Sequence, residues 1–139
     1  MNVDNMNEKI VATLVSDKNR LAMLPKHFGH FMMGIENRVY GFMREMCDAY
    51  DGGYWHYYEL SNGGFYMAPD MDEQLTISVE SNLVCGEMSA DAAGITVCLF
   101  AYSHMSFAPG AQGIGEYYHL LRDYAFQHDE VQMIMKAID

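Results

Sequence analysis

Histidine and cysteine are the residues of this sequence that could hold a metal or act as a catalytic base or nucleophile. The chain has six histidines and three cysteines. His27 and His30 lie three residues apart across an expected turn, the other histidines are scattered, and no two cysteines form a CxxC pair. A structural zinc site needs four converging ligands, and no local pair in this sequence would begin one. We therefore expect no metal site.

Nucleophilic catalysis and cofactor binding also lack a recognisable motif. There is no GxSxG sequence, and Cys85 or Cys98 could reach a histidine only through tertiary folding. The spacing of Gly110, Gly113 and Gly115 matches neither of the common glycine-rich phosphate loops. We expect neither a cofactor nor an enzyme, and we keep a small hydrolase that depends on cysteine or histidine as an alternative.

The charge of the chain indicates which partners it avoids. The net charge is −11, because 8 Lys and Arg face 19 Asp and Glu. No lysine or arginine occurs between Arg44 and Arg122, and the 11 acidic residues of that stretch account for the whole net charge. Such a chain is repelled by nucleic acid and by anionic membranes, so we expect it to bind neither directly. The acidic residues serve either solubility or the recognition of a basic partner.

Aromatic residues are concentrated between residues 54 and 69, on both sides of Asn62-Gly63. An Asn-Gly pair between two extended stretches is typical of a β-hairpin with a two-residue turn, which would pair Leu60 with Phe65. Alternation then places two sets of side chains on opposite faces. The face expected in the core carries Tyr54, His56, Tyr58, Leu60, Phe65 and Met67. The other face carries Trp55, Tyr57, Glu59, Tyr66 and Ala68.

This second face is a candidate for contact with another protein. Tyrosine and tryptophan at a surface make strong protein anchors, and three acidic residues follow the hairpin closely. The alternatives are that helices cover both faces of the hairpin and that the acidic residues are only solvated. The predicted partner surface consists of Trp55, Tyr57, Glu59, Tyr66, Asp70, Asp72 and Glu73.

Several stretches have the capping residues or the periodicity of helices. Ser16 can cap a short helix that ends near Leu24, before a proline. Residues 34–50 repeat apolar side chains every three or four residues and predict an amphipathic helix. Ser89 can cap a long uncharged helix, which we expect to be buried because it is too short and polar for a membrane span. Two terminal helices are expected at residues 116–127 and 129–137.

These elements predict the fold class and the domain organisation. Residues 75–79 alternate apolar and polar side chains as a third strand does, and residues 84–88 supply a fourth. We predict an α+β fold, in which a small antiparallel sheet of three to four strands, with its hairpin at residues 54–69, is packed by several helices. A chain of 139 residues fits one domain, residues 1–139, with residues 1–15 as a flexible or extended arm. The unpaired cysteines predict a cytoplasmic protein.

The segment Gly52–Pro69, with the sequence GGYWHYYELSNGGFYMAP, resembles the signature block of the ArdB/KlcA antirestriction family. Residues 24–29 (LPKHFG), 86–94 (GEMSADAAG) and 137–139 (AID) resemble further blocks of that family in the same order. The resemblance implies a cytoplasmic protein of plasmids or other mobile elements that protects incoming DNA from host type I restriction, without known catalysis or cofactor. It supplies no active site, so we interpret its signature residues as fold-defining. These residues are Gly53, Trp55, Ser61, Asn62, Gly63, Gly64, Phe65 and Pro69.

An acidic antirestriction protein could imitate the charge of DNA, but the charge density argues against this. A globule of this mass has roughly 7,300 Å² of surface, which gives about one net charge per 330 Å² on one half, against about one per 110 Å² on duplex DNA. We therefore expect binding to the host type I restriction-modification complex, or to an associated host protein, through a mixed aromatic and acidic surface. An acidic DNA mimic and a structural partner of another plasmid protein are the alternatives.

Overall fold

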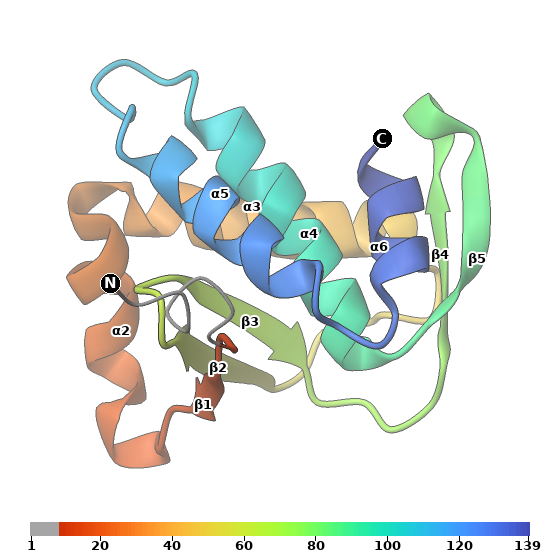
Figure 1. Ribbon diagram of the computed structural model, residues 1–139, viewed down its shortest axis with the longest axis horizontal. Helices are drawn as coiled ribbons and strands as arrows, with labels where there is room; N and C mark the ends of the chain where they lie inside the picture. Colours follow the sequence, from red (N-terminus) through yellow and green to blue (C-terminus); the bar gives the residue numbers. More distant parts are fainter. Residues whose placement is uncertain (1–8) are drawn as a thin grey trace, which may run out of the picture.

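Helices pack against two small sheets in the fold of this chain (Figure 1). The computed structural model describes residues 9–139. The strands are β1 (Ala12–Leu14), β2 (Trp55–Leu60), β3 (Phe65–Pro69), β4 (Leu75–Val79) and β5 (Val84–Met88). The α-helices are α2 (Arg20–Phe28), α3 (Met32–Met46), α4 (Ala90–Met105), α5 (Ile114–Ala125) and α6 (Val131–Ile138). Short 3-10 turns are η1 (Asp17–Asn19), η2 (Gly29–Phe31) and η3 (Glu80–Asn82). The predicted α+β class is confirmed.

The strands form two antiparallel sheets, whereas the sequence predicted one. The first sheet has the order β1-β2-β3, and β4 pairs with β5 in a second sheet. In Figure 1 the second sheet stands beside α6, at the far end of the molecule from α2. β1 lies within the arm predicted at residues 1–15, where it pairs Thr13 with Glu59, and residues 1–8 of that arm lie outside the described residues.

The central helix α4 runs along the outer edge of β3 and explains why the sheets are separate. The Tyr102 hydroxyl donates a hydrogen bond to the Phe65 carbonyl, and the Met67 amide lies 3.5 Å from the Cys98 Sγ. Gly94 permits this close approach, because a Cβ atom there would lie 2.5 Å from the Met67 carbonyl oxygen. A strand edge covered by a helix is not available for pairing, so β4 has no place beside β3.

The predicted cap and burial of α4 are confirmed. Ser89 Oγ accepts a hydrogen bond of 3.1 Å from the amide of Ala92, which satisfies one of the free amides in the first turn. Most of the helix is buried, including Ile95 and Leu99, which have no exposed surface. Within residues 9–139, no helix is both long and apolar enough to cross a membrane.

The hairpin forms at the predicted place, but its register differs by one residue. The Leu60 amide donates to the Gly64 carbonyl and the Gly63 amide donates to the Leu60 carbonyl, both at 2.9 Å, so the loop has three residues rather than two. Gly63 adopts a positive φ of 96° that closes this loop. Glu59, not Leu60, therefore pairs with Phe65.

This shift reverses the predicted faces of β2. When the register shifts by one residue, each side chain of β2 shares a face with the other set of β3 side chains. Tyr57 now shares a face with Met67, and both are buried, whereas Tyr58 and His56 on the other face are only half-buried. The prediction that Tyr54, His56 and Tyr58 belong to the core face was therefore wrong, since Tyr54 is 45% exposed and Trp55 and Tyr57 are buried instead. Leu60 is buried, as predicted.

The first helix does not end at Leu24, as the sequence predicted, and continues through Pro25 to Phe28. Proline removes the amide that would donate to the carbonyl of Leu21. Leu21 is 94% exposed, so water can reach that carbonyl and the loss is tolerated on the outer side of the helix. The helix ends instead at Gly29, which has a positive φ of 54°. The extra turn carries His27 and Phe28 toward the first sheet.

The remaining helices lie close to their predicted positions. Helix α3 buries Ile35, Val39 and Met43, as the periodicity indicated, but it ends at Met46 rather than at Tyr50. Tyr50 is nevertheless buried beyond the helix end. The two terminal helices α5 and α6 are also confirmed.

Candidate functional site

The aromatic members of the predicted partner surface lie in the core. Trp55, Tyr57 and Tyr66 are 2%, 6% and 1% exposed. The Trp55 indole Nε1 donates a hydrogen bond of 3.0 Å to the Tyr50 hydroxyl, and the Tyr66 hydroxyl donates one of 2.7 Å to Asp91. These side chains are inaccessible in the folded chain, so the expectation that they anchor a partner has to be replaced. The register shift places Trp55 and Tyr57 on the core face, whereas Tyr66 lies on the opposite face beside Tyr58, where Asp91 of α4 and Tyr124 of α5 contact it.

The acidic members of the predicted surface are accessible. Asp70, Asp72 and Glu73 are exposed in the connection between β3 and β4. Asp70 Oδ1 accepts a hydrogen bond of 3.0 Å from His56 Nε2, and no ion pair within residues 9–139 involves Asp72 or Glu73. A contact role for these three residues stays a prediction.

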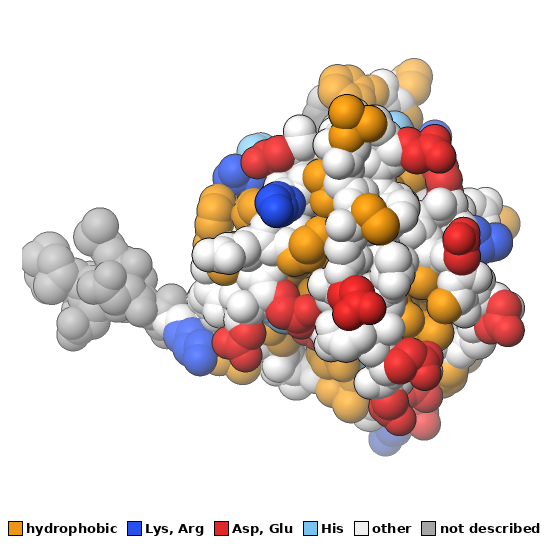
Figure 2. Space-filling model, turned by 90° about the vertical axis from the view of Figure 1, so that its right-hand side faces the viewer, with side chains coloured by type: hydrophobic (Ala, Val, Ile, Leu, Met, Phe, Trp, Pro, Cys, Tyr) orange, Lys and Arg blue, Asp and Glu red, His pale blue; other side chains and the backbone are white. Residues whose placement is uncertain are grey.

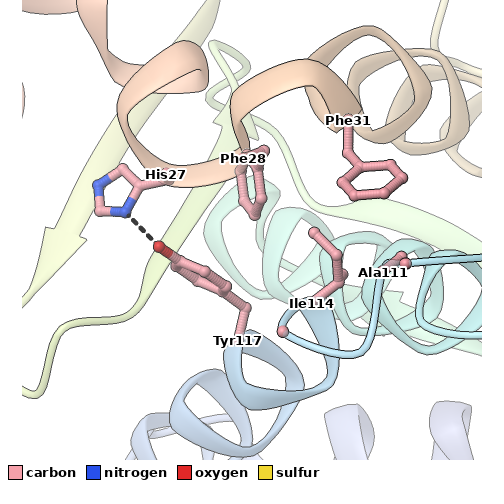
Figure 3. Close-up of a pocket in the computed structure, with 8 residues that line it drawn as sticks. His27, Phe28, Phe31, Ala111, Ile114 and Tyr117 are labelled. Carbon is pink, nitrogen blue, oxygen red and sulfur yellow. Dashed lines mark hydrogen bonds between the residues drawn. The ribbon is translucent and has the colours of Figure 1, made fainter.

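Glu59, the last predicted surface residue, belongs to a hydrogen-bond network that joins β2, α2 and α5. Its Oε2 accepts from His27 Nε2 at 2.7 Å and from Lys26 Nζ at 2.8 Å. Because a carboxylate only accepts, Nε2 carries a proton, and in the neutral ring Nδ1 then accepts from the Tyr117 hydroxyl, 2.9 Å away (Figure 3). The hydrogen bond from Lys26, followed by that from His27, lowers the pKa of Glu59, which stays an anion.

The hydrogen-bonded His27 and Tyr117 border a small apolar pocket. Figure 3 shows the rings of Phe28 and Phe31 facing Ile114 across it. The cavity volume is about 210 Å³, below the range of about 300 to 1,000 Å³ that is usual for small-molecule sites. The pocket therefore has room for about one side chain of a partner. It is lined by His27, Phe28, Phe31, Gly110, Ala111, Gly113, Ile114 and Tyr117.

The chemistry of this pocket favours binding over bond-breaking. Burial raises the pKa of Tyr117, so its hydroxyl stays protonated at neutral pH. Both ring nitrogens of His27 are hydrogen-bonded already, and its side chain is only 8% exposed. The network thus holds three elements together at the pocket wall. Sequence reasoning missed it, because the turn expected at residues 24–29 hid the helical position of His27, and nothing local connects residue 27 with residue 117.

The groups proposed for catalysis or metal binding are dispersed. Burial raises the pKa of Cys98 to about 12, so this thiol stays protonated, and Cys47 is also buried. Cys85 is exposed on the outer face of β5, where its Sγ accepts a hydrogen bond of 3.3 Å from Ser78. Across residues 9–139, no three histidine, cysteine or acidic side chains are arranged to hold a metal ion.

A second polar network ties the N-terminus of α4 to the α5–α6 connection. The Asp91 carboxylate accepts from His128 Nε2 at 2.9 Å and from the Tyr66 hydroxyl at 2.7 Å. The hydrogen bond that His128 donates to Asp91 raises the pKa of His128 and outweighs the opposing effect of burial. Glu130 accepts from the backbone amide of Ser89 at 2.8 Å. All of these groups are partnered within the protein, so the network is structural.

The signature residues occupy the turns of the hairpin and the positions that pack beneath it. Asn62 Oδ1 accepts from the Gly64 amide, and its Nδ2 donates to the Leu120 carbonyl of α5, both at 2.9 Å. Ser61 Oγ accepts from the Val11 amide at 2.8 Å and links the hairpin loop to the residue just before β1. Gly53 has a positive φ of 115°. The remaining signature residues, Trp55, Gly63, Phe65 and Pro69, lie in the hairpin itself.

Comparison with known proteins gives a consistent result over nearly the full chain. The family described as "Antirestriction protein" matches residues 48–139. Two proteins of Escherichia coli named antirestriction protein KlcA are 43% and 45% identical, covering 99% and 94% of this chain and 100% and 94% of their own lengths. A solved structure is 45% identical, with a TM-score of 0.85 over 95% of this chain and 98% of its own. This solved structure is one of the KlcA and ArdB proteins. Those proteins show a novel fold and antirestriction activity against type I DNA restriction systems in vivo but not in vitro.

Proposed function

The chain belongs to the antirestriction protein family, and from this membership we propose that it protects incoming plasmid or mobile-element DNA from host type I restriction by binding a host protein. The partner is the type I restriction-modification complex or a host protein that acts with it. Neither catalysis nor full imitation of DNA is part of the proposal.

The observation that carries this proposal is the contrast described for the KlcA and ArdB proteins, which act in vivo but not in vitro. An inhibitor that blocked the DNA-binding surface of the restriction complex by itself would also act in a purified mixture. Activity confined to the cell is expected when the inhibitor needs a further cellular protein or state. The likeness over nearly the whole chain supports extending this mechanism to the present protein.

The charge density of the folded chain also favours protein contact over DNA mimicry. The accessible surface is 7976 Å². With all 11 net charges on one half, there is about one charge per 360 Å², roughly three times sparser than on duplex DNA. Some acidic residues also accept hydrogen bonds within the protein, since Asp91 accepts from His128 and Glu130 accepts from the Ser89 amide.

The protonation and the hydrogen-bond partners of the candidate catalytic side chains argue against the alternative that the protein is a hydrolase. Cys98 is a buried, protonated thiol and Tyr117 is a protonated phenol. His27, His56 and His128 each donate to a carboxylate, and none of them is hydrogen-bonded to a serine or cysteine side chain within the described residues.

Phage plating on a restricting host tests the proposed function directly. Unmodified phage should plate more efficiently on cells that express the chain, and a strain without the type I system should show no difference. Exposed groups that a catalytic mechanism could use, such as Cys85 and His119, should be replaceable by alanine without loss of protection. Loss of protection in Cys85→Ala, with folding intact, would favour the hydrolase, and retention of protection by a mixture of purified components would favour DNA mimicry.

A further inference from the structure

A groove lies between the C-terminal end of α3 and strand β4, on the other side of the molecule from the His27 pocket. It consists of two adjoining hollows with volumes of about 450 and 440 Å³, which share Glu45, Met46, Ser78 and Glu80. Residues 74–80 along its length correspond to roughly 20 Å of extended chain. Figure 2, which faces the end of the molecule with β4, β5 and α6, shows acidic side chains with apolar surface between them.

The rim of the groove carries uncompensated negative charge. Glu45, Asp48 and Glu80 line it, and no lysine or arginine does. None of the three takes part in an ion pair within the described part of the chain. Arg44 is exposed in the last turn of α3 but does not line the groove.

The position of two of these acidic residues is unfavourable for the protein itself. Glu45 lies in the last turn of α3 and Asp48 lies two residues beyond the helix end at Met46. The C-terminus of a helix carries partial negative charge and disfavours acidic side chains. Glu80 adds a third like charge from across the groove. A site that tolerates such repulsion in the free protein is suited to a ligand that brings positive charge.

The floor of the groove is apolar and can accept a hydrophobic side chain. Phe42 and Phe100 are half-buried, with ring centroids 5.6 Å apart, and they line one hollow together with Met46 and Val79. His104 closes this hollow and packs edge-on against Phe42. The groove therefore combines an apolar floor with acidic rims, which is the arrangement that recognises a basic segment with an apolar anchor.

We propose that this groove, the α3–β4 groove, is the docking site for a basic, extended segment of the partner protein, with lysine or arginine residues flanking a large apolar side chain. The inference rests on the proposed function and names the surface that it uses. DNA does not fit, because its phosphates would meet the acidic rim. A second copy of this chain does not fit either, because its net charge of −11 opposes association.

A synthetic peptide with arginines on both sides of one leucine tests the groove, because it carries the proposed chemistry and nothing else. Titration into the ¹⁵N-labelled full chain should shift amide resonances of residues 42–49 and 74–81. Binding should weaken as salt rises from about 50 to about 300 mM, since exposed charge pairs are screened. A set of shifted resonances centred on another surface, or no binding at about 50 mM salt, would contradict the proposal.

Charge-matched variants separate the groove from acidity in general. The triple variant Glu45→Gln/Asp48→Asn/Glu80→Gln should weaken peptide binding about tenfold. It should not lower the Tm, because it removes like-charge repulsion and an unfavourable contact with the helix end. The control Glu116→Gln/Asp123→Asn/Asp129→Asn makes the same change of net charge at exposed positions on α5 and just after it, none of which lines the groove, and should leave binding nearly unchanged. Equal loss of binding in both variants would overturn the proposal.

Phage plating with the same two variants tests the docking site separately from the antirestriction function. The groove variant should lose protection and the control should keep it. If the unaltered chain itself gives no protection, the proposed function is wrong. If the unaltered chain and the groove variant protect equally, the function stands and the groove is not its docking site.

Discussion

His27 shows how much a single side chain contributes to this fold. Its ring lies on α2, donates to Glu59 on β2 and accepts from Tyr117 on α5. A buried polar group that loses its partner costs the full free energy of its desolvation, so each end of this network depends on the other two. The histidine was visible in the sequence, but its partners are 32 and 90 residues away along the chain.

We expect His27→Ala to lower the free energy of unfolding by about 2 kcal/mol, because two hydrogen bonds are lost and the Tyr117 hydroxyl keeps no partner. Urea denaturation followed by circular dichroism measures the change. The matched control is His30→Ala, since His30 is exposed and should change the stability by less than about 0.5 kcal/mol. Equal effects of the two substitutions would contradict a special role of the His27 network.

His128 predicts a pH dependence of a definite sign. Its pKa is raised in the folded protein by the hydrogen bond with Asp91, so the protonated ring stabilises the native state. This contribution is fully present below the unfolded pKa of about 6.5 and is lost as the pH rises through the higher folded pKa. The stability difference between the native chain and His128→Gln should therefore be larger at pH 6 than at pH 9. A difference that grows toward pH 9 would show that the neutral ring is the favoured form.

At the scale of elements, the contact between α4 and β3 organises the molecule. Helix α4 covers the outer edge of β3, which is the edge of the first sheet opposite β1. β4 therefore cannot pair with β3 and pairs with β5 in a second sheet. The contact is possible because residue 94 has no side chain.

Gly94→Ala should destabilise the protein by about 2 kcal/mol or more, because its Cβ would lie 2.5 Å from the Ala68 Cβ and backbone shifts would be needed to relieve the clash. Gly41 on α3 offers an internal comparison, since a Cβ there meets nothing within 4 Å. Gly41→Ala should stabilise the chain by about 0.5 to 1 kcal/mol through helix propensity. Thermal and urea unfolding of both variants checks the opposite signs, and a neutral Gly94→Ala would mean that α4 and β3 are less tightly packed.

The elements that the sequence predicted well are those decided by local pattern. The Ser89 cap of α4, the apolar stripe of α3 and the alternation in β4 are each contained within a few residues. The misplaced features depend on contacts that no local pattern contains. The hairpin loop takes a third residue because Asn62 reaches α5, and Pro25 stays within α2 because its outer side is open to water.

The candidate site was harder to predict than the fold, for the same reason. Because the observed register of the hairpin differs by one residue from the predicted one, Trp55 and Tyr57 lie in the core and not on the predicted surface. The charge pattern alone indicated the acidic stretch after Arg44, but not that Glu45 and Glu80 meet across a groove. Residues 35 positions apart in the chain can be brought together only by the packing of β4 beside α3.

For the whole molecule, a net charge of −11 on a small fold means that the native state is opposed by its own charge. Raising the sodium chloride concentration from about 20 to about 300 mM should screen this repulsion and raise the Tm. Relief of about 1 kcal/mol would correspond to roughly 4 °C for a domain of this size. The groove variant Glu45→Gln/Asp48→Asn/Glu80→Gln should respond less to salt. A Tm that falls with added salt would mean that attractive ion pairs dominate.

Cys85 offers a practical consequence of the fold. Of the three cysteines, it alone is exposed, and its Sγ lies 3.3 Å from the hydroxyl of Ser78, a residue of the groove wall. A thiol-reactive fluorophore would therefore attach at this one place without any engineered mutation, next to the surface where a partner should settle. The unaltered polypeptide carries its own attachment point for a reporter of occupancy, and dye emission could follow complex formation in a cell extract in real time.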